Sequence, residues 1–328
     1  MIVLAGDIGG THVRLALARE AGGGVELLHT SVVEGATQPD LATPVRALLD
    51  VHGLRPDAAC LGVAGTVEGQ RVSGVNLPWP EIDARALERA CGIGRVTLIN
   101  DFHAAARGVE QLGEGDALTL NPGHAEPGEP VAVLGAGTGL GQAFLVGPPG
   151  RRLVLATEGG HRDFAPRDAL QDRLLAFLRA RHTGRVSTER VLSGPGLLAI
   201  YEFLRAEGRP GDPEVDAAWG QSGAGKLLST RGVANAHPTS AAAVGVFVDV
   251  YGAEAGNMVL TLLTRGGVWV AGGIAPDLFA DPAQAAAFQR AYLDKGRFQP
   301  LLAEVPVRLV THPALGLLGA AAEALNLG

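Results

Sequence analysis

Two glycine-rich loops, each between two apolar runs, restrict the possible folds of this 328-residue chain more than any other feature. The first is AGDIGGTHVRLALA at Ala5–Ala18, and the second is VAVLGAGTGLGQAFLV at Val131–Val146. After the first loop, Val13, Leu15 and Leu17 occupy alternate positions, which is typical of a strand. Each loop therefore joins a strand to a strand, and the repetition predicts two α/β domains that share one architecture.

Both loops are candidates for holding phosphate groups. Glycine lets a ligand approach the main chain closely, and consecutive backbone N–H groups form a concavity that binds anions. Neither Gly6–Thr11 nor Gly135–Gly141 is a P-loop, because no Gly-Lys-Ser/Thr follows, and neither opens the helix that a dinucleotide-binding turn requires. An ordinary hairpin turn is the alternative for each loop taken alone.

A single carboxylate, Asp7, lies in the first loop. Its negative charge would weaken the binding of an anion unless a cation lies between the carboxylate and that anion. Mg²⁺ is commonly held by one carboxylate, water and substrate phosphates, so Asp7 is a candidate magnesium ligand that acts through water. The alternative is that Asp7 caps its own turn.

Strands and helices alternate along the rest of the chain. The predicted strands are Ala58–Val63, Val96–Ile99, Leu153–Leu155, Val268–Ala271 and Arg308–Val310. The predicted helices are Asp40–Val51, Asp83–Cys91, Phe102–Leu112, Asp168–Arg181, Thr239–Thr264 (one long helix or a helix pair) and Ala314–Leu325. The segment Arg209–His237 is rich in Gly, Pro and charged residues and is expected to contain irregular stretches.

Further polar stretches lie at or near the ends of these strands. They are NLPWP at Asn76–Pro80, LIND at Leu98–Asp101, ATEGGH at Ala156–His161, ERVLSGPG at Glu189–Gly196 and VAGGIAP at Val270–Pro276. Ligands of α/β proteins bind outside the carboxyl ends of strands. Carboxylates and amides there suit a polyhydroxyl ligand, because each hydroxyl group can both donate and accept.

Phosphoryl transfer to an alcohol needs Mg²⁺, backbone donors on the phosphates and a carboxylate that takes the hydroxyl proton. Asp101 is the candidate base, and an N-cap of the following helix is its alternative role. His161 could instead be a structural histidine whose polar atoms are satisfied within the protein. Glu158 and Glu189 could instead be solvated or ion-paired groups on the surface. Gly272–Gly273 could be a tight strand exit without a ligand.

Composition argues against several classes of protein. The formal net charge is −7 and no Lys/Arg run is present, so neither nucleic acid nor a membrane surface is an expected partner. Cys60 and Cys91 have neither disulfide nor metal spacing, which favours a reducing cytoplasm. The apolar run Ala241–Val248 is shorter than the ~20 residues of a membrane helix. The N-terminus MIVLAGD lacks a signal-peptide pattern.

Eight stretches, in order along the chain, resemble the bacterial ATP-dependent glucokinase family of the sugar kinase–Hsp70–actin superfamily. They are AGDIGGTHVRLAL, NLPW, LINDFHAAARG, VLGAGTGLGQAFL, ATEGGHRDFAP, ERVLSGPGL, VAGGIAPDL and PALGLLGAA. The resemblance implies an α/β two-domain actin-like ATPase (ribonuclease H-like) fold with an interdomain cleft. It implies a small domain at 1–110 plus 311–328 and a large domain at 111–310. The implied activity transfers the γ-phosphoryl group of ATP to the 6-hydroxyl of glucose.

The resemblance also implies roles for individual residues. Asp101 would take the proton from the 6-hydroxyl. The sugar ligands would be Asn76, Asn100, Asp101, Glu158, His161 and Glu189. The nucleotide would be bound by Asp7 with Mg²⁺, Gly9, Gly10, Thr11, Gly137, Thr138, Gly139, Gly272 and Gly273. Family members are commonly homodimers. The related ROK kinases carry a Cys-rich zinc motif that Cys60 and Cys91 cannot supply, so no structural zinc is expected.

Two other functions remain as alternatives. The first is another hexose kinase, for mannose, fructose or glucosamine. The second is a non-catalytic sugar sensor on the same fold, against which the intact Asp101 and both glycine loops argue. An actin-like polymerising ATPase would keep the phosphate loops but would have no need of LIND and EGGH.

Overall fold

Two β-sheets organise the chain, one in each of two units. The computed structural model describes residues 1–73 and 77–327. Unit 1 consists of Met1–Asp116, Val154–Ala156 and His312–Gly328, and unit 2 of Ala117–Leu153 and Thr157–Thr311. These units are defined by their contacts, and a contact unit need not fold as an independent domain. The domain boundaries expected from the sequence therefore stay a prediction.

Unit 1 is built on a five-stranded sheet in the order β3-β2-β1-β4-β8. Its strands are β1 Ile2–Ile8, β2 His12–Ala21, β3 Gly24–Glu34, β4 Ala58–Val63 and β8 Val96–Asn100, with a small second sheet of β5 Val67–Glu68, β6 Arg71–Ser73 and β7 Glu81–Asp83. Its helices are α1 Ala42–His52, α2 Ala84–Cys91, α3 Asp101–Gly108 and α12 Leu315–Leu325, with short 3₁₀ turns at Gly35–Thr37 and Val109–Gln111.

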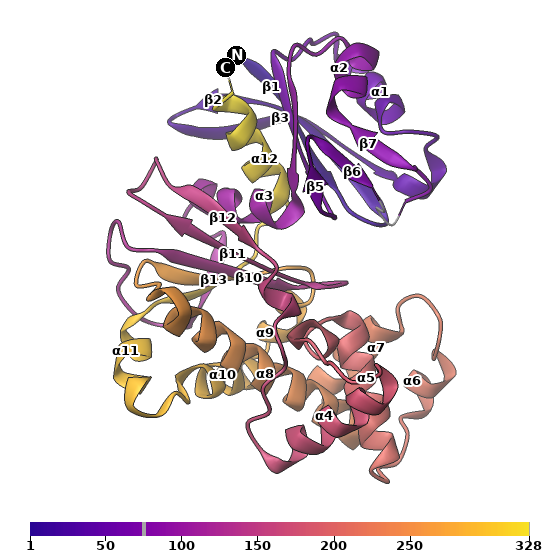
Figure 1. The fold of residues 1–328 in the computed structure, drawn as a ribbon, viewed down its shortest axis with the longest axis vertical. Helices are drawn as coiled ribbons and strands as arrows, with labels where there is room; N and C mark the ends of the chain where they lie inside the picture. Colours follow the sequence, from indigo (N-terminus) through magenta and orange to yellow (C-terminus); the bar gives the residue numbers. More distant parts are fainter. Residues whose placement is uncertain (74–76, 328) are drawn as a thin grey trace. The chain divides into compact units, whose positions relative to one another are not determined.

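Both faces of this sheet are buried, and residue size differs between them. On β1, Val3 and Ala5 belong to a cluster of mostly small side chains with α3 and α12. Leu4 and Ile8 point the other way, into a larger cluster with α1 and α2. Alternate residues of a strand face opposite sides, so one apolar strand serves both layers. The C-terminal helix α12 thus lies against α3 in the same unit, although about 200 residues separate them in the sequence (Figure 1).

Unit 2 is built on a six-stranded sheet in the order β12-β11-β10-β13-β14-β9. The strands are β9 Ala117–Asn121, β10 Val131–Ala136, β11 Leu140–Val146, β12 Leu153–Thr157, β13 Gly267–Ala271 and β14 Val307–Val310. The helices are α4 Ala169–Arg181, α5 Gly194–Ala206, α6 Pro213–Ala217, α7 Ala224–Val233, α8 Pro238–Leu262, α9 Ala275–Phe279, α10 Pro282–Leu293 and α11 Gln299–Glu304, with 3₁₀ turns η3 Gly159–His161, η4 Thr188–Arg190 and η5 Gly296–Phe298.

The two sheets repeat one topology. In unit 1, β1 pairs antiparallel with β2 and parallel with β4, and β4 pairs parallel with β8. In unit 2, β10 pairs antiparallel with β11 and parallel with β13, and β13 pairs parallel with β14. Each glycine loop joins the antiparallel pair at the same place in its sheet. The predicted α/β class and the duplicated architecture are therefore confirmed.

Several observed elements, among them β3, β9, α5 and α10, have no predicted counterpart, and some predicted segments differ in detail. The helix expected over Phe102–Leu112 starts at Asp101, ends at Gly108 and continues as a 3₁₀ turn. The segment Arg209–His237 contains the helices α6 and α7 between its turns. Of the two possibilities considered for Thr239–Thr264, the structure confirms one long helix, which spans Pro238–Leu262.

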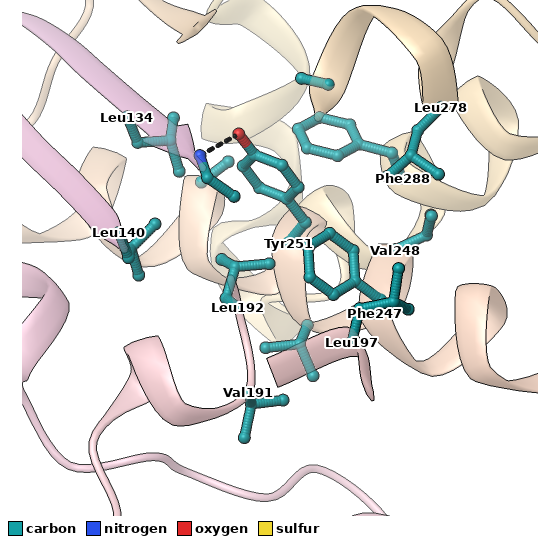
Figure 2. Packing of buried hydrophobic residues seen from close by; sticks show 14 of the residues in the cluster. Leu134, Leu140, Val191, Leu192, Leu197, Phe247, Val248, Tyr251, Leu278 and Phe288 are labelled. Atoms are coloured by element: carbon teal, nitrogen blue, oxygen red, sulfur yellow. Dashed lines mark hydrogen bonds between the residues drawn. The ribbon is translucent and has the colours of Figure 1, made fainter. Parts of the chain in front are cut away.

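The long helix α8 forms the centre of unit 2. Within residues 1–73 and 77–327 it is the one helix long and apolar enough to cross a membrane, and 78% of its apolar window is buried inside the protein. Phe247, Val248 and Tyr251 on α8 pack with Leu134 of β10 and Phe288 of α10 (Figure 2). A helix that is apolar on nearly all sides is expected at the core of a protein as well as in a membrane. In this structure α8 is a core helix.

Candidate active site

The first glycine loop, Gly9–Thr11, connects β1 to β2. Ile8 and Val13 are the last paired residues of the two strands, and the N–H of Gly9 donates to the carbonyl of His12 at 3.0 Å. Gly10 and Thr11 are exposed. The loop is a strand-to-strand turn with accessible main chain, as the sequence predicts.

Asp7 lies at the end of β1, beside two groups from elsewhere in unit 1. The Arg14 guanidinium is 3.2 Å from the Asp7 carboxylate. A Cβ atom placed on Gly316, in the first turn of α12, would lie 3.2 Å from Asp7 Cγ. Burial raises the pKa of Asp7 above its ordinary value, and Arg14 partly opposes this shift. A second cation close to Asp7 would therefore stabilise its ionised form.

The end of β8 carries Asn100 and Asp101, and the structure separates their roles. The N-cap of α3 is Asn100, whose Oδ1 accepts from the N–H groups of Phe102 and His103. Its Nδ2 donates to the carbonyl of Gly65 at 3.2 Å. Asp101 is the first helical residue, so the N-cap role considered for it is wrong.

Helix α3 is tied to α12 by a carboxylate near the C-terminus. Glu323 Oε1 accepts from Arg107 Nε at 2.7 Å and lies 3.1 Å from His103 Nε2. Burial acts to raise the pKa of Glu323, but the hydrogen bonds and charges of His103 and Arg107 outweigh it and hold the pKa below its ordinary value of 4.5.

A lowered pKa predicts how the stability of unit 1 depends on pH. The contribution of Glu323 is present above pH 4.5 and is lost as pH falls through its lower folded-state pKa. Glu323→Gln should cost about 2 kcal/mol at neutral pH and flatten the decline on acidification. Urea unfolding of both proteins between pH 3 and 7 measures this difference. Parallel curves for the two proteins would show that Glu323 does not titrate with folding.

The second glycine loop, Gly137–Gly139, is linked to Glu189. The backbone N–H of Leu140, next to the loop, donates to Glu189 Oε2 at 2.9 Å. The loop is closed by a bond from the N–H of Gly137 to the carbonyl of Gly139, and Gly194 N–H donates to the carbonyl of Gly137, both at 2.8 Å. A predicted sugar ligand and a predicted phosphate loop, about 50 residues apart, are thus in direct contact.

Glu158 and His161 lie on one exposed turn after β12. Glu158 Oε2 is 3.8 Å from His161 Nε2, and the N–H of His161 donates to the carbonyl of Glu158 at 3.0 Å. The two side chains are 74% and 57% exposed, so both are accessible to a ligand. The exposure of His161 leaves both its ligand role and its structural alternative as predictions.

Gly272 and Gly273 follow β13. Gly272 has a φ of +85°, and a Cβ atom there would lie 2.5 Å from the carbonyl oxygen of Ala136, the last residue of β10. Only glycine tolerates that backbone conformation and that approach without strain. A Cβ atom on Gly273 would have no neighbour within 4 Å, so Gly273 is open on that side.

A cavity of about 160 Å³ in unit 2 borders Thr138 and Glu189. Arg181, His182 and Arg190 also line it, so basic groups predominate there. Partial burial and the charges of Arg190 and Arg181 lower the pKa of His182. A cavity with two guanidinium groups attracts anionic ligands such as phosphate esters. Neither arginine was singled out from the sequence, because nothing local marks them.

Asn76 lies outside the described residues. Among residues 1–73 and 77–327, no cluster of three or more His, Cys, Asp or Glu side chains is arranged to bind a metal ion. Mg²⁺ bound with a nucleotide needs only one or two carboxylates besides the phosphates, so the Asp7 carboxylate fits that ion. The expected lack of zinc stays a prediction.

Comparison with known proteins gives a consistent result. The family model described as Glucokinase matches residues 4–327. A glucokinase from Nostoc sp. is 39% identical in an alignment 343 residues long, and the alignment covers 99% of each chain. The crystal structure of a glucokinase from an Antarctic psychrotroph superposes with a TM-score of 0.84 at 29% identity and covers 99% of both chains.

A more distant structure matches in fold. It is a ROK family glucokinase from Streptomyces griseus in complex with glucose and AMPPNP, with a TM-score of 0.69, 22% identity and full coverage of both chains. The two-domain actin-like ATPase fold expected from the sequence agrees with these neighbours. By its family match over residues 4–327 and its 39% identity to a full-length relative, this chain belongs to the glucokinase family of ATP-dependent sugar kinases.

Proposed function

We propose that this protein transfers the γ-phosphoryl group of Mg·ATP to the 6-hydroxyl of glucose and releases glucose 6-phosphate and ADP. The observation that carries the proposal most directly is the bond between Glu189 and Leu140 N–H. It joins a side chain suited to a sugar hydroxyl to the loop suited to a phosphate. Both segments border one cavity lined by basic groups, which suits a reaction between a sugar and a phosphate donor.

Asp101 acts as the general base. It would accept the proton of the 6-hydroxyl as the oxygen attacks the γ-phosphorus, which makes that oxygen a better nucleophile. Its position at the start of α3, directly after β8, supports this role, because ligands of α/β proteins bind outside the carboxyl ends of strands.

The sugar is held through its other hydroxyls by Asn76, Asn100, Glu158, His161 and Glu189. Carboxylates accept hydrogen bonds from hydroxyls, and amides and imidazoles both donate and accept. The 3.8 Å separation of Glu158 and His161 is short enough for both to contact neighbouring hydroxyls of one pyranose. Glu189 can bind a hydroxyl through Oε1 while Oε2 accepts from Leu140.

The nucleotide phosphates are bound by the main chain at Gly9, Gly10 and Thr11 and at Gly137, Thr138 and Gly139. Gly272 and Gly273 lie beside the nucleoside, where the open side of Gly273 leaves room. Asp7 would hold Mg²⁺ through water, and the bound ion would neutralise charge on the transferring phosphoryl group. We further propose a cytoplasmic homodimer with the domain boundaries 1–110 plus 311–328 and 111–310.

Asp7→Asn should separate activity from stability. The substitution removes the charge that favours Mg²⁺, so kcat should fall about 100-fold. Because burial raises the pKa of Asp7, its ionised form opposes folding at neutral pH, and the neutral amide should keep or raise the melting temperature. Steady-state kinetics at several Mg²⁺ concentrations and thermal unfolding test both effects. A lower melting temperature would instead assign Asp7 to the Arg14 pair as a structural group.

The proposed function is tested by sugar-dependent release of ADP from Mg·ATP. Glucose, mannose, fructose, glucosamine and N-acetylglucosamine are compared, and the product is identified as the 6-phosphate. We expect a strong preference for glucose. Activity with another sugar but not with glucose would show that glucose is not the substrate, and the proposed role of Asp101 would still hold. Binding of a sugar without any release of ADP would favour a sugar sensor.

A further inference from the structure

Near the middle of the core helix α8, the buried side chains of Tyr251 and Glu254 carry polar atoms. Tyr251 is completely buried and Glu254 is 5% exposed. Residues three positions apart are neighbours on a helix surface. Their polar atoms nevertheless reach different segments of unit 2, and these are the segments to which the proposed function assigns the nucleotide and the sugar.

The Tyr251 hydroxyl connects the ends of two parallel strands. It accepts a hydrogen bond from the N–H of Ala136 at 3.0 Å, shown as the dashed line in Figure 2, and donates to the carbonyl of Ala271 at 3.2 Å. Ala136 is the last residue of β10 and Ala271 the last residue of β13. The glycines proposed to bind the nucleotide follow directly after both.

The ring of Tyr251 is held firmly by its neighbours. Phe247 lies edge-on with ring centroids 6.0 Å apart, and the rings of Phe279 and Phe288 lie at 5.6 and 5.9 Å. Burial raises the pKa of Tyr251, so the hydroxyl stays protonated and can donate at any physiological pH. The hydroxyl therefore occupies a fixed position between the two strand ends.

Glu254 is the centre of a buried polar network. Its Oε1 accepts from Gln142 Nε2 at 2.7 Å and from the guanidinium of Arg162. Its Oε2 accepts from Asn257 Nδ2 at 3.0 Å. Asn257 in turn accepts at Oδ1 from Lys295 Nζ at 2.6 Å, which fixes the orientation of its amide. Every group that faces Glu254 in this network is a donor.

Arg162 and Gln142 carry this network to the turn that bears Glu158 and His161. Arg162 Nε donates to the carbonyl of Gly159 at 3.1 Å. Thr157 Oγ1 donates to the main-chain carbonyl of Gln142 at 2.9 Å and accepts from Gly159 N–H at 3.1 Å. Both polar groups of the Gly159 backbone are thus held.

We propose that Tyr251 and Glu254 are positioning residues, and that each sets the geometry of one substrate site: Tyr251 that of the nucleotide loops and Glu254 that of the sugar-binding turn. The inference rests on the proposed function. Neither residue touches a substrate. Because each acts through a different set of hydrogen bonds, their effects on the two substrates should be separable.

The test compares KM values for the two substrates in two conservative variants. Tyr251→Phe keeps the ring and removes the hydroxyl, so KM for ATP should rise about fivefold while KM for glucose stays within twofold. Glu254→Gln keeps the shape but turns an N–H group toward the donors around it. Asn257 cannot flip to compensate, so KM for glucose should rise about tenfold while KM for ATP stays within twofold.

Two control variants separate positioning from general loss of stability. Arg162→Lys keeps a positive charge beside Glu254 but removes the Nε–H donor to Gly159, whose carbonyl then keeps the main-chain N–H of residue 162. The side chain of Arg162 is half-exposed, so the substitution should leave the fold intact. It should raise KM for glucose as Glu254→Gln does. Asp212→Asn disturbs another buried carboxylate, which accepts from Arg231 and Ser240 at 2.7 Å. It should lower the melting temperature without changing either KM.

Three results would overturn the inference: both KM values rising together in each variant, neither value rising, or Asp212→Asn giving the same pattern. Calorimetric titration of ADP and of glucose separately provides a second readout of the same split. If the wild-type enzyme lacks activity with every sugar, the proposed function fails, whereas an active wild type with an unchanged Glu254→Gln variant contradicts only the positioning role.

Discussion

Asp101→Asn is expected to lower kcat for glucose phosphorylation about 10²–10⁴-fold, the usual range for loss of a general base. The amide cannot accept the hydroxyl proton, but it can replace the Asp101 Oδ1 that accepts from the N–H of Phe102 at 2.8 Å. The fold of α3 should therefore persist, since its N-cap is Asn100. The dissociation constant for glucose should change far less than kcat.

The measurement is kcat by coupled assay together with the glucose dissociation constant by calorimetry. Asp83→Asn provides a matched control, because Asp83 caps α2 in the same unit by accepting from Ala86 N–H at 2.9 Å. Asn caps helices as well as Asp does, so this control should leave kcat unchanged and lose only the surface ion pair of Asp83 with Arg71 at 2.9 Å. A kcat for Asp101→Asn close to that of the wild type would mean that another group removes the proton.

Gly319→Ala is expected to destabilise unit 1 by about 3 kcal/mol or more. A Cβ atom on Gly319 of α12 would lie 1.7 Å from the carbonyl oxygen of Ala104 on α3, so the two helices must move apart. Neither helix can move easily, because both pack against the same sheet through small side chains. Activity should fall as well, because α3 begins with Asp101.

The control is the same substitution at Gly245, inside α8. A Cβ atom there would have no neighbour within 4 Å, and Gly245 is exposed. Ala favours a helix over Gly, so Gly245→Ala should stabilise the protein by about 0.5–1 kcal/mol. Urea unfolding of the three proteins measures both changes. Similar effects at the two positions would show that α3 and α12 can separate without cost.

Some elements could not be predicted from local pattern. In β3 half-buried and exposed positions alternate from His29 to Glu34, but apolar and polar residues do not, so the period-two sequence pattern that marks a strand is missing. β9 becomes a strand by pairing with β14, almost 190 residues later in the chain. Helix α5 is different, because its start does carry a local helix signal: Ser193 accepts from Gly196 N–H, and a proline lies in the first turn. This signal was missed because the stretch was interpreted as a ligand motif.

In the candidate site, too, features set by neighbouring residues were predictable and contacts between distant residues were not. The loops at Gly9–Thr11 and Gly137–Gly139 were predictable, because strand, glycine turn and strand follow one another along the chain. The bond from Glu189 to Leu140 could not be predicted, nor could the basic lining of the cavity beside Thr138. Glu254 carries one local signal, a carboxylate within an apolar helix, but nothing in the sequence indicates its partners.

The sequence by itself determined the family, the α/β class, the two strand–loop–strand segments and the residue types available for phosphate and hydroxyl binding. These properties depend on neighbouring residues, and turn chemistry and strand periodicity act over a few positions. The tertiary structure alone decided that α12 approaches Asp7, that Glu189 binds beside the second loop and that Glu254 supports the turn at Gly159. Such contacts join residues tens to hundreds of positions apart, and they form only when packing of the whole unit repays the entropy of closing those long loops.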